Sequence, residues 1–202
     1  MPELLTPLWL LGVVGLAGYM IGSIPFGVVV ARVMGLGDLR AIGSGNIGAT
    51  NVMRTGNKAA GVLTFVLDAG KGAIAALGAW ALLGEDAAQA AALAAFLGHL
   101  YPVYLGFRGG KGVATFIGTA LALAWPVALG VCAIWALVFK LGRISSLAAL
   151  VASAFSPVLA LVFGYQSMAA LFGILTAMIF YKHIENIRRL LTGTEARFDK
   201  KR

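Results

Sequence analysis

The stretch VATFIGTALALAWPVALGVCAIWALVF, residues 113–139, decides the fold of this chain. It carries no charged side chain and is longer than the roughly 20 apolar residues that cross a hydrocarbon core of about 30 Å. Trp125-Pro126 interrupts it in the middle, and proline disrupts the interior of a helix. The stretch therefore forms either one long helix or two short ones.

The composition of the whole chain is that of a membrane protein. Of its 202 residues, 60% are hydrophobic and 12% are charged, against roughly 25% charged in an average soluble domain. We expect one membrane domain over residues 1–202. Residues 8–34 lack the flanks of a signal peptide and are predicted to be a first span, bent near Pro25. Further spans are predicted at 59–83, 87–107, 144–163 and 165–181.

The positive charges select between the two readings of residues 113–139. The connections at 1–6, 84–86, 124–126 and 164–166 contain no basic residue. Cytoplasmic connections are enriched in Lys and Arg. A single crossing by 113–139 would leave Lys140 and Arg143 outside, whereas two segments place them inside. The basic residues on or near the predicted cytoplasmic side are Arg32, Arg40, Arg54, Lys58, Lys71, Arg108, Lys111, Lys140, Arg143, Lys182, Arg188, Arg189, Arg197, Lys200, Lys201 and Arg202.

The predicted fold is therefore an all-α membrane protein of about seven segments. The N-terminus lies outside, and a basic tail at residues 182–202 lies in the cytoplasm. Two segments have only about 12–14 residues, too few for a comfortable span. They either cross where the bilayer is locally thin or form a re-entrant hairpin. Cys132 is the single cysteine, so no disulfide can form within the chain.

Three polar clusters fall on the predicted cytoplasmic face: residues 44–54, residues 108–115 and residues 182–189. The first follows the sequence GSIPFG at residues 22–27. Glycine N–H groups, hydroxyls, amides and fixed positive charges can close around an anion. The clusters predict anionic chemistry at a membrane surface.

The glycine-rich motifs do not belong to the familiar nucleotide-binding types. Residues 43–48 match G-x-G-x-x-G, but no βαβ unit surrounds them. A plain turn is the alternative, although a turn does not need several hydroxyl, amide and guanidinium groups together. Gly109-Gly110-Lys111-Gly112 is not a P-loop, because glycine follows the lysine. It does precede a predicted helix at 113–124, whose start would direct unpaired N–H groups toward phosphate.

The third cluster and two buried residues each have a structural alternative. His183, Asn186 and Arg189 recur at i, i+3 and i+6, so they share roughly one face at the end of the last helix. A lipid-binding amphipathic helix is the alternative, and we prefer it for residues 197–202. Asp68 and Lys71 lie inside the second span, where an ion pair and a site role are equally open. His99 is expected to be a buried, paired histidine.

At these motifs the chain resembles the bacterial integral-membrane acyl-phosphate:glycerol-3-phosphate acyltransferases (PlsY). The resemblance covers almost the whole chain. It rests on five blocks: GSIPFG (22–27), GSGNIGATN (43–51) with Arg54, DAGKG (68–72), His99 to Pro102 with FRGGKGVAT (107–115), and HIENIRRLL (183–191) with Gly193.

The resemblance implies transfer of a fatty acyl group from acyl phosphate to the 1-hydroxyl of glycerol 3-phosphate. Lysophosphatidic acid and inorganic phosphate would be the products, at an early step of phospholipid synthesis in the bacterial inner membrane. It places five catalytic residues in a cytoplasmic site: Ser44, Arg54, Lys111, His183 and Asn186. Substrate-binding residues would be Gly43, Gly45, Asn46, Gly48, Thr50, Asn51, Gly109, Gly110, Gly112, Thr115 and Glu185.

The residues are compatible with direct transfer that forms no acyl-enzyme. No serine lies in a G-x-S-x-G elbow, and the cysteine lies in an apolar run. The base is His183 or a substrate phosphate oxygen, and both stay open. We expect no cofactor, no metal and no nucleic-acid partner. The sequence predicts neither the acyl chain length nor the oligomeric state.

Two other classes of function compete with an enzyme. An organic-anion or phosphate transporter would need a polar path to the far side, and the spans offer only Asp68 and Lys71. A lipid-binding scaffold would not need paired glycine-rich loops. Release of inorganic phosphate from acyl phosphate on addition of glycerol 3-phosphate separates these classes.

Overall fold

The computed structural model describes residues 2–198, and within this range the regular elements are all helical. The described chain forms two compact units, residues 2–123 and residues 124–198. Lys200, Lys201 and Arg202 of the predicted basic tail lie outside the described residues. The expectation of a single membrane domain stays a prediction.

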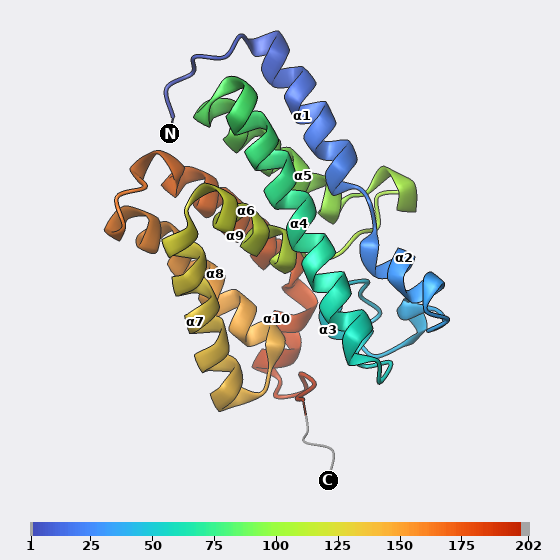
Figure 1. Cartoon of the computed structure of the whole chain (residues 1–202). Helices are drawn as coiled ribbons and strands as arrows, with labels where there is room; N and C mark the ends of the chain where they lie inside the picture. Colours follow the sequence, from blue (N-terminus) through green and yellow to red (C-terminus); the bar gives the residue numbers. More distant parts are fainter. Residues whose placement is uncertain (1, 199–202) are drawn as a thin grey trace. The chain divides into compact units, whose positions relative to one another are not determined.

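The first unit begins with two helices separated by a short break. α1 (Leu8–Gly22) ends before Ser23, and α2 (Phe26–Val33) begins directly after Pro25. The predicted bend near Pro25 is therefore confirmed. α1 packs against α5 (Glu85–Leu100), as Figure 1 shows. Gly18 and Gly22 allow this close approach, because a Cβ at either position would strike the α5 backbone.

α4 (Lys58–Leu83) is the longest helix of the first unit. The Asn57 side chain accepts a hydrogen bond from the Ala60 N–H at 3.0 Å and so caps its start. α4 packs against α5 and against α6 (Val113–Leu123). At Gly118 the α6 backbone touches Ala69, so only glycine fits there. Small residues thus allow these helices to pack closely, as the sequence indicates.

Asp86, in the first turn of α5, holds the segment that precedes α1. Its carboxylate accepts hydrogen bonds from the backbone N–H groups of Leu5 at 2.9 Å and Thr6 at 2.7 Å. The Thr6 hydroxyl donates to the second carboxylate oxygen at 2.9 Å. α5 itself ends at Leu100, earlier than predicted, because Tyr101-Pro102 follows. A short turn, η2 (Val103–Leu105), comes next.

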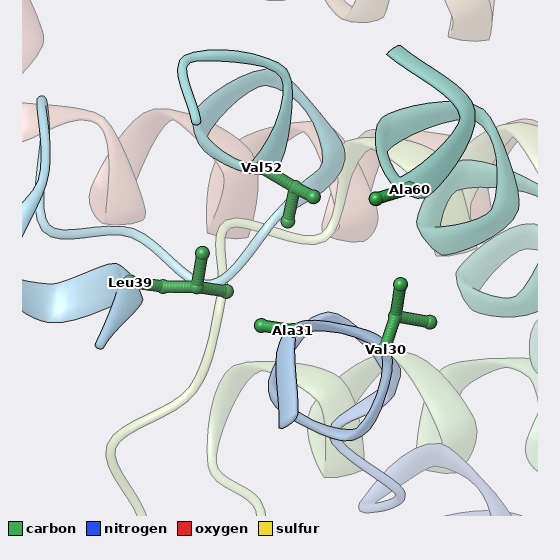
Figure 2. Close-up of a cluster of buried hydrophobic side chains, with 5 residues drawn as sticks. All are labelled: Val30, Ala31, Leu39, Val52 and Ala60. Carbon is green, nitrogen blue, oxygen red and sulfur yellow. The ribbon is translucent and has the colours of Figure 1, made fainter. Parts of the chain in front are cut away.

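A small apolar core gathers four elements at one end of the first unit (Figure 2). Val30 and Ala31 come from α2, and Leu39 comes from η1 (Leu39–Ala41). Val52 belongs to α3 (Ala49–Met53), and Ala60 belongs to α4. The glycine-rich residues 42–48 connect η1 to α3, so this core fixes both ends of that loop.

The second unit contains α7 (Trp125–Gly142), α8 (Ser145–Val162), η3 (Gln166–Met168), α9 (Ala169–Lys182) and α10 (Ile184–Leu191). α7 packs on α8, and α8 packs on α9. Ala124 leaves the helical conformation, and Pro126 lies in the first turn of α7. The predicted division of residues 113–139 at Trp125-Pro126 is therefore confirmed.

The two segments produced by that division differ in length. α6 has 11 residues, which makes it a short segment as predicted. α7 has 18 residues and is longer than predicted, because no helix breaker occurs until Arg143, whose φ is +55°. Lys140 consequently lies in the last turn of α7, where a cation complements the helix dipole.

Pro157 lies inside α8 and lacks the N–H that would bond to the Ser153 carbonyl four residues earlier. Two hydroxyl groups donate to this carbonyl in place of the missing N–H. Ser156 Oγ donates to Ser153 O at 2.7 Å, and Thr176 Oγ1 of α9 donates to the same oxygen at 2.7 Å. The carbonyl exposed by the proline is thus satisfied inside the helix pair.

Within the described residues, five helices are long and apolar enough to cross a membrane. As spans they are Leu8–Val33 (α1 with α2), Lys58–Leu83, Glu85–Leu105 (α5 with η2), Trp125–Gly142 and Ser145–Val162, and the bent pair Gln166–Lys182 with Ile184–Leu191 can add a sixth. Apolar side chains such as Val66 and Ile74 of α4 are exposed on the protein surface, as lipid contact allows. The predicted all-helical membrane fold is confirmed.

Candidate active site

Residues 42–48, here called the first glycine loop, are held in shape by a buried amide. The side-chain oxygen of Asn51 accepts hydrogen bonds from Ser44 N at 3.0 Å and from Ser44 Oγ at 3.3 Å. The Asn51 Nδ2 group donates to Leu39 O at 2.8 Å. Asn51 is 1% exposed, whereas Ser44 is exposed on the surface. The buried amide therefore presents Ser44 outward in a fixed loop.

Arg54 lies over the same loop. Gly43 has φ +55°, and a Cβ built there would lie 2.7 Å from Arg54 Cδ and 3.0 Å from Arg54 Nη1. The guanidinium is therefore packed beside Gly43, one residue from Ser44. Asn46 Oδ1 accepts from the following N–H at 3.0 Å, so its amide shapes the loop as well. The structure thus brings Ser44 and Arg54 together.

Residues 108–112, here called the second glycine loop, fold back onto the end of α5. Gly109 N donates to Leu100 O at 3.2 Å, and Gly110 N donates to His99 O at 3.0 Å. The last carbonyls of a helix have no partner within it, and these two N–H groups satisfy them. They are therefore not the unpaired donors that the sequence predicted for phosphate.

Steric contacts explain the glycines of the second glycine loop. A Cβ at Gly109 would strike the carbonyl oxygens of His99 and Leu100. A Cβ at Gly110 would strike the His99 ring, and one at Gly112, where φ is +85°, would strike Phe96. Lys111 lies half-buried between Gly110 and Gly112. The close approach of the loop to α5 thus fixes the backbone that carries Lys111.

One hydrogen bond joins the two glycine loops. Arg40 Nη2, next to the first glycine loop, donates to the Arg108 carbonyl of the second. Ser44 and Lys111 accordingly lie on two connected loops of the same unit, and the Arg54 side chain packs beside the first of them. Thr115 is fully buried, and its hydroxyl donates to Asp68 O at 2.9 Å. It fastens α6 to α4, a structural task that the sequence did not indicate.

Beneath the loops lies a buried charged cluster. Lys71 Nζ lies 2.9 Å from Asp68 Oδ1, and both side chains are 2% exposed. His99 Nδ1 lies 3.6 Å from the same oxygen. Lys71 Nζ also donates to Ile24 O at 2.8 Å. The ion pair and the buried position of His99 are as expected, whereas the link to Ile24 is new.

The third polar cluster belongs to the second unit and differs from its prediction. His183 lies at the break between α9 and α10, where the chain bends by 64°. Asn186 and Arg189 lie on α10, and both donate to Glu195, at Oε1 and at Oε2. Ser146 Oγ donates to Glu195 Oε1 at 2.7 Å. The three predicted residues therefore do not continue one straight helix, because the bend intervenes.

The sequence analysis did not select Glu195 or Ser146. Burial works to raise the pKa of Glu195, but hydrogen bonds from Ser146, Asn186 and Arg189 outweigh it and hold the pKa below its usual value. The sequence signal that could have identified Glu195 is its acidic side chain within a predominantly basic tail. Glu185 is different, because it is exposed and pairs with Arg188 at 2.8 Å.

The hydrogen bond of His183 defines its tautomer. His183 is 3% exposed, and its Nδ1 lies 2.8 Å from Ile179 O. A carbonyl oxygen only accepts, so Nδ1 is assigned the ring proton, and Nε2 is the acceptor nitrogen of the neutral imidazole. Asn186 is 3% exposed. Within residues 2–198 there is no group of three His, Cys, Asp or Glu residues that could hold a metal ion.

Comparisons with known proteins cover nearly the whole chain. Residues 12–193 match the family model described as glycerol-3-phosphate acyltransferase. A glycerol-3-phosphate acyltransferase of Cereibacter sphaeroides is 61% identical over 201 residues, which covers 100% of each chain. One of Jannaschia sp. is 59% identical over 199 residues, with 98% of each chain covered.

A solved structure has the same fold. The crystal structure of PlsY (YgiH), an integral membrane glycerol 3-phosphate acyltransferase, in its glycerol 3-phosphate form matches with a TM-score of 0.89. The two chains are 44% identical, and the match covers 94% of this chain and 96% of that one. The fold and the match define a multi-pass integral membrane acyltransferase.

The chain belongs to the PlsY glycerol-3-phosphate acyltransferase family. This membership decides against the transporter and scaffold alternatives, and it places the chain in phospholipid synthesis. The comparisons leave the roles of individual site residues untested, so these roles stay predictions.

Proposed function

We propose that this enzyme transfers a fatty acyl group from acyl phosphate to the 1-hydroxyl of glycerol 3-phosphate. The hydroxyl oxygen attacks the acyl carbonyl carbon, and the bond from that carbon to the phosphate oxygen breaks. Lysophosphatidic acid and inorganic phosphate are the products. The observation that carries the proposal is the joining of two glycine loops that hold Ser44, Arg54 and Lys111 in one unit.

The chemistry of the loops suits two phosphorylated substrates. Arg54 and Lys111 supply fixed positive charge, and charge-assisted hydrogen bonds to phosphate are the strong ones. The related PlsY structure in its glycerol 3-phosphate form supports the acceptor, and a lysophosphatidic acid form supports the product. The latter is 41% identical to this chain, with a TM-score of 0.86.

We assign phosphate binding to the first glycine loop and to the Lys111 end of the second, because carbonyls of α5 occupy the N–H groups of Gly109 and Gly110. Ser44 orients a substrate through its hydroxyl. Arg54 and Lys111 stabilise the negative charge that develops on the carbonyl oxygen and on the leaving phosphate. Catalysis then rests on positioning and on electrostatic stabilisation, since acyl phosphate is already activated. Asn46 of the first loop and Thr50 of α3 complete the phosphate contacts in this proposal, whereas the buried Asn51 amide acts indirectly, by holding Ser44 in place.

His183 and Asn186 serve the acceptor substrate in the same proposal. Asn186 holds glycerol 3-phosphate, and the hydroxyl proton passes to His183 Nε2 or to a phosphate oxygen. The bond from Nδ1 to Ile179 O supports His183 as the acceptor, because it makes Nε2 the basic nitrogen of the neutral imidazole. A His183→Gln variant distinguishes the two routes. If a phosphate oxygen is the base, that variant keeps the pH profile of the native enzyme.

Transfer takes place in one displacement, without an acyl-enzyme. Cys132 is half-buried in α7, in a part of that helix that carries no charged side chain before Lys140. The Ser44 hydroxyl donates to the Asn51 amide oxygen, which is not a base, so this contact does not activate Ser44 as a nucleophile. Incubation with labelled acyl phosphate alone, followed by mass spectrometry, should detect no adduct. A stoichiometric acyl group that is then passed to glycerol 3-phosphate would overturn this route.

The site faces the cytoplasm of a bacterial inner membrane in this proposal, with the N-terminus outside. Residues 35–58, 108–112, 140–146 and 182–202 are assigned to the cytoplasmic side, since the basic residues concentrate there. A cysteine placed at the exposed position 143 should resist an impermeant thiol reagent in intact cells. Labelling from outside at this position would reverse the orientation.

The decisive experiment measures both products with the purified enzyme in detergent. Addition of glycerol 3-phosphate to enzyme and acyl phosphate should release inorganic phosphate and form lysophosphatidic acid in equal amounts. An acyl thioester replaces acyl phosphate in the parallel reaction and should give no product. Product formation from the thioester alone would keep the acyltransferase and reject acyl phosphate as the donor.

A further inference from the structure

Two chains of contacts, here called the Lys71 branch and the His99 branch, begin at the buried cluster of Asp68, Lys71 and His99 in the first unit. Asp68 Oδ1 is 2.9 Å from Lys71 Nζ and 3.6 Å from His99 Nδ1. Asp68 is 2% exposed, Lys71 is 3% exposed and His99 is 4% exposed. One carboxylate therefore meets two basic side chains, one on α4 and one on α5, away from solvent.

The Lys71 branch leads to the first glycine loop. Lys71 Nζ donates to Ile24 O at 2.8 Å, in the break between α1 and α2, and lies 5.8 Å from the centre of the Phe26 ring. The next residue, Gly27, touches the Ile47 carbonyl so closely that no Cβ fits between them. Ile47 is part of the first glycine loop. Lys71 thus fixes the helix break that supports this loop.

The His99 branch leads to the second glycine loop. Its ring packs on Gly110, and its carbonyl accepts from Gly110 N at 3.0 Å. The residue after Gly110 is Lys111, the proposed phosphate ligand. The orientation of the His99 ring therefore helps to set the backbone beside Lys111.

We propose that Asp68 is a positioning residue that sets both glycine loops at once, through Lys71 on one side and through His99 on the other. The inference rests on the proposed function, because it assigns the loops to phosphate binding. It assigns Asp68 and Lys71 of the DAGKG block (residues 68–72) a positioning role that needs no contact with the reacting atoms.

The cost of a buried charge supports this role over a purely structural one. Ionisable groups inside a membrane-spanning helix are expensive, and well-packed apolar residues often stabilise a protein as well as a buried ion pair does. An ion pair is directional, however, and Lys71 uses its remaining donors to hold a carbonyl in a helix break. Such a link fixes geometry, which apolar packing does less sharply.

Hydrogen–deuterium exchange of the purified enzyme in detergent tests the two branches separately. The reporters are the bonded N–H groups of Ser44, Gly45 and Ile47 in the first loop, and those of Gly109 and Gly110 in the second. Lys71→Met should speed exchange in the first loop only. His99→Gln should speed exchange in the second loop only, and Asp68→Asn should speed both.

Kinetics of the same variants give a second readout. Asp68→Asn should raise the KM for glycerol 3-phosphate about tenfold and should lower kcat as well, because misplaced loops bind the substrate less well and stabilise the transition state less well. Asp86→Asn is the matched control. It removes a hydrogen-bonded carboxylate from the opposite end of α5 and should leave loop exchange and KM unchanged.

The combined variant Asp68→Asn with Lys71→Met leaves no unpaired buried charge, so it covers the case in which Asp68→Asn alone does not fold. It should show faster exchange in both loops. Native exchange in both loops, or a uniform rise throughout residues 2–123, would overturn the inference. Exchange needs no substrate, so failure of the acyl transfer reaction would reject the proposed function while leaving this result interpretable.

Discussion

The two glycine loops have similar compositions but owe their shapes to different forces. In the first, a buried side-chain amide from Asn51 ties down the backbone, and Gly43 and Gly45 adopt positive φ values of +55° and +67°. In the second, glycine allows close approach of the backbone to the end of α5. Glycine thus serves turn geometry above all at Gly45 and steric fit above all at Gly109, so the same substitution at these two positions should have unequal effects.

The largest effect is expected from Gly109→Ala. Its Cβ would meet two backbone oxygens, neither of which can rotate away, so the second loop must move. A displacement of about 1 Å can cost about a hundredfold in rate. Gly45→Ala is the matched change in the first loop, where the nearest atom lies at 3.2 Å and only positive φ is strained. kcat/KM of both variants checks this order, and equal losses would remove the distinction.

Next come the cations that the two loops carry. Arg54→Ala and Lys111→Ala each remove a proposed charge-assisted contact to phosphate, worth about 1.5–3 kcal/mol. We expect kcat/KM to fall by about tenfold to a hundredfold in each variant, with an unchanged melting temperature. Arg32→Ala, a basic residue in the last turn of α2, is the control. Near-native turnover at saturating substrates would remove that residue from the site.

A smaller effect, mainly on stability, is expected from Asn51→Ala. The substitution leaves the Ser44 N–H without its partner and the Leu39 carbonyl with only the long bond from Ile42 N at 3.4 Å, and an unsatisfied buried group costs about 1–3 kcal/mol. Thermal unfolding in detergent should show the loss, and exchange should increase in the first loop rather than in the second. Increased exchange in the second loop would mean that one mechanism holds both.

The smallest effect on folding is expected from Gly48→Ala. Its φ is −78°, and a Cβ would make an ordinary contact at 3.4 Å with Asn46 Nδ2. The stability should change by less than about 0.5 kcal/mol. If phosphate approaches this backbone as proposed, the KM for glycerol 3-phosphate rises while the melting temperature stays the same. An unchanged KM would exclude Gly48 from substrate binding.

The helical membrane fold and the break at Trp125-Pro126 were predictable because they depend on local properties: long apolar runs, proline and the sidedness of charge. The end of α7 was not, since the helix continues past Phe139 to Gly142 without any local signal to stop earlier. The bend after Lys182 escaped prediction for the same reason, because no proline or glycine marks it.

In the candidate site, too, features that depend on local chemistry were predictable, and features that depend on long-range contacts were not. Side-chain chemistry pointed to Ser44, Arg54, Lys111 and His183, since hydroxyl, cationic and imidazole groups together indicate phosphate and proton transfer. It could not show that the N–H groups of Gly109 and Gly110 are occupied by carbonyls of α5. Nor could it link Glu195 to Asn186, because that contact depends on the turn that follows α10. Long-range contacts of this kind have no signature in the sequence.

The two hydroxyls at the Ser153 carbonyl form a redundant pair. Ser156 and Thr176 both donate to one oxygen that Pro157 leaves without its helical partner. Either donor alone keeps the oxygen satisfied, so loss of the first should be cheap and loss of the second expensive. The two positions should therefore be epistatic, with a double substitution costing more than the sum of the single ones. In a lipid environment, where water cannot replace a missing donor, that redundancy lets the chain vary at either position while the Ser153 carbonyl keeps a partner.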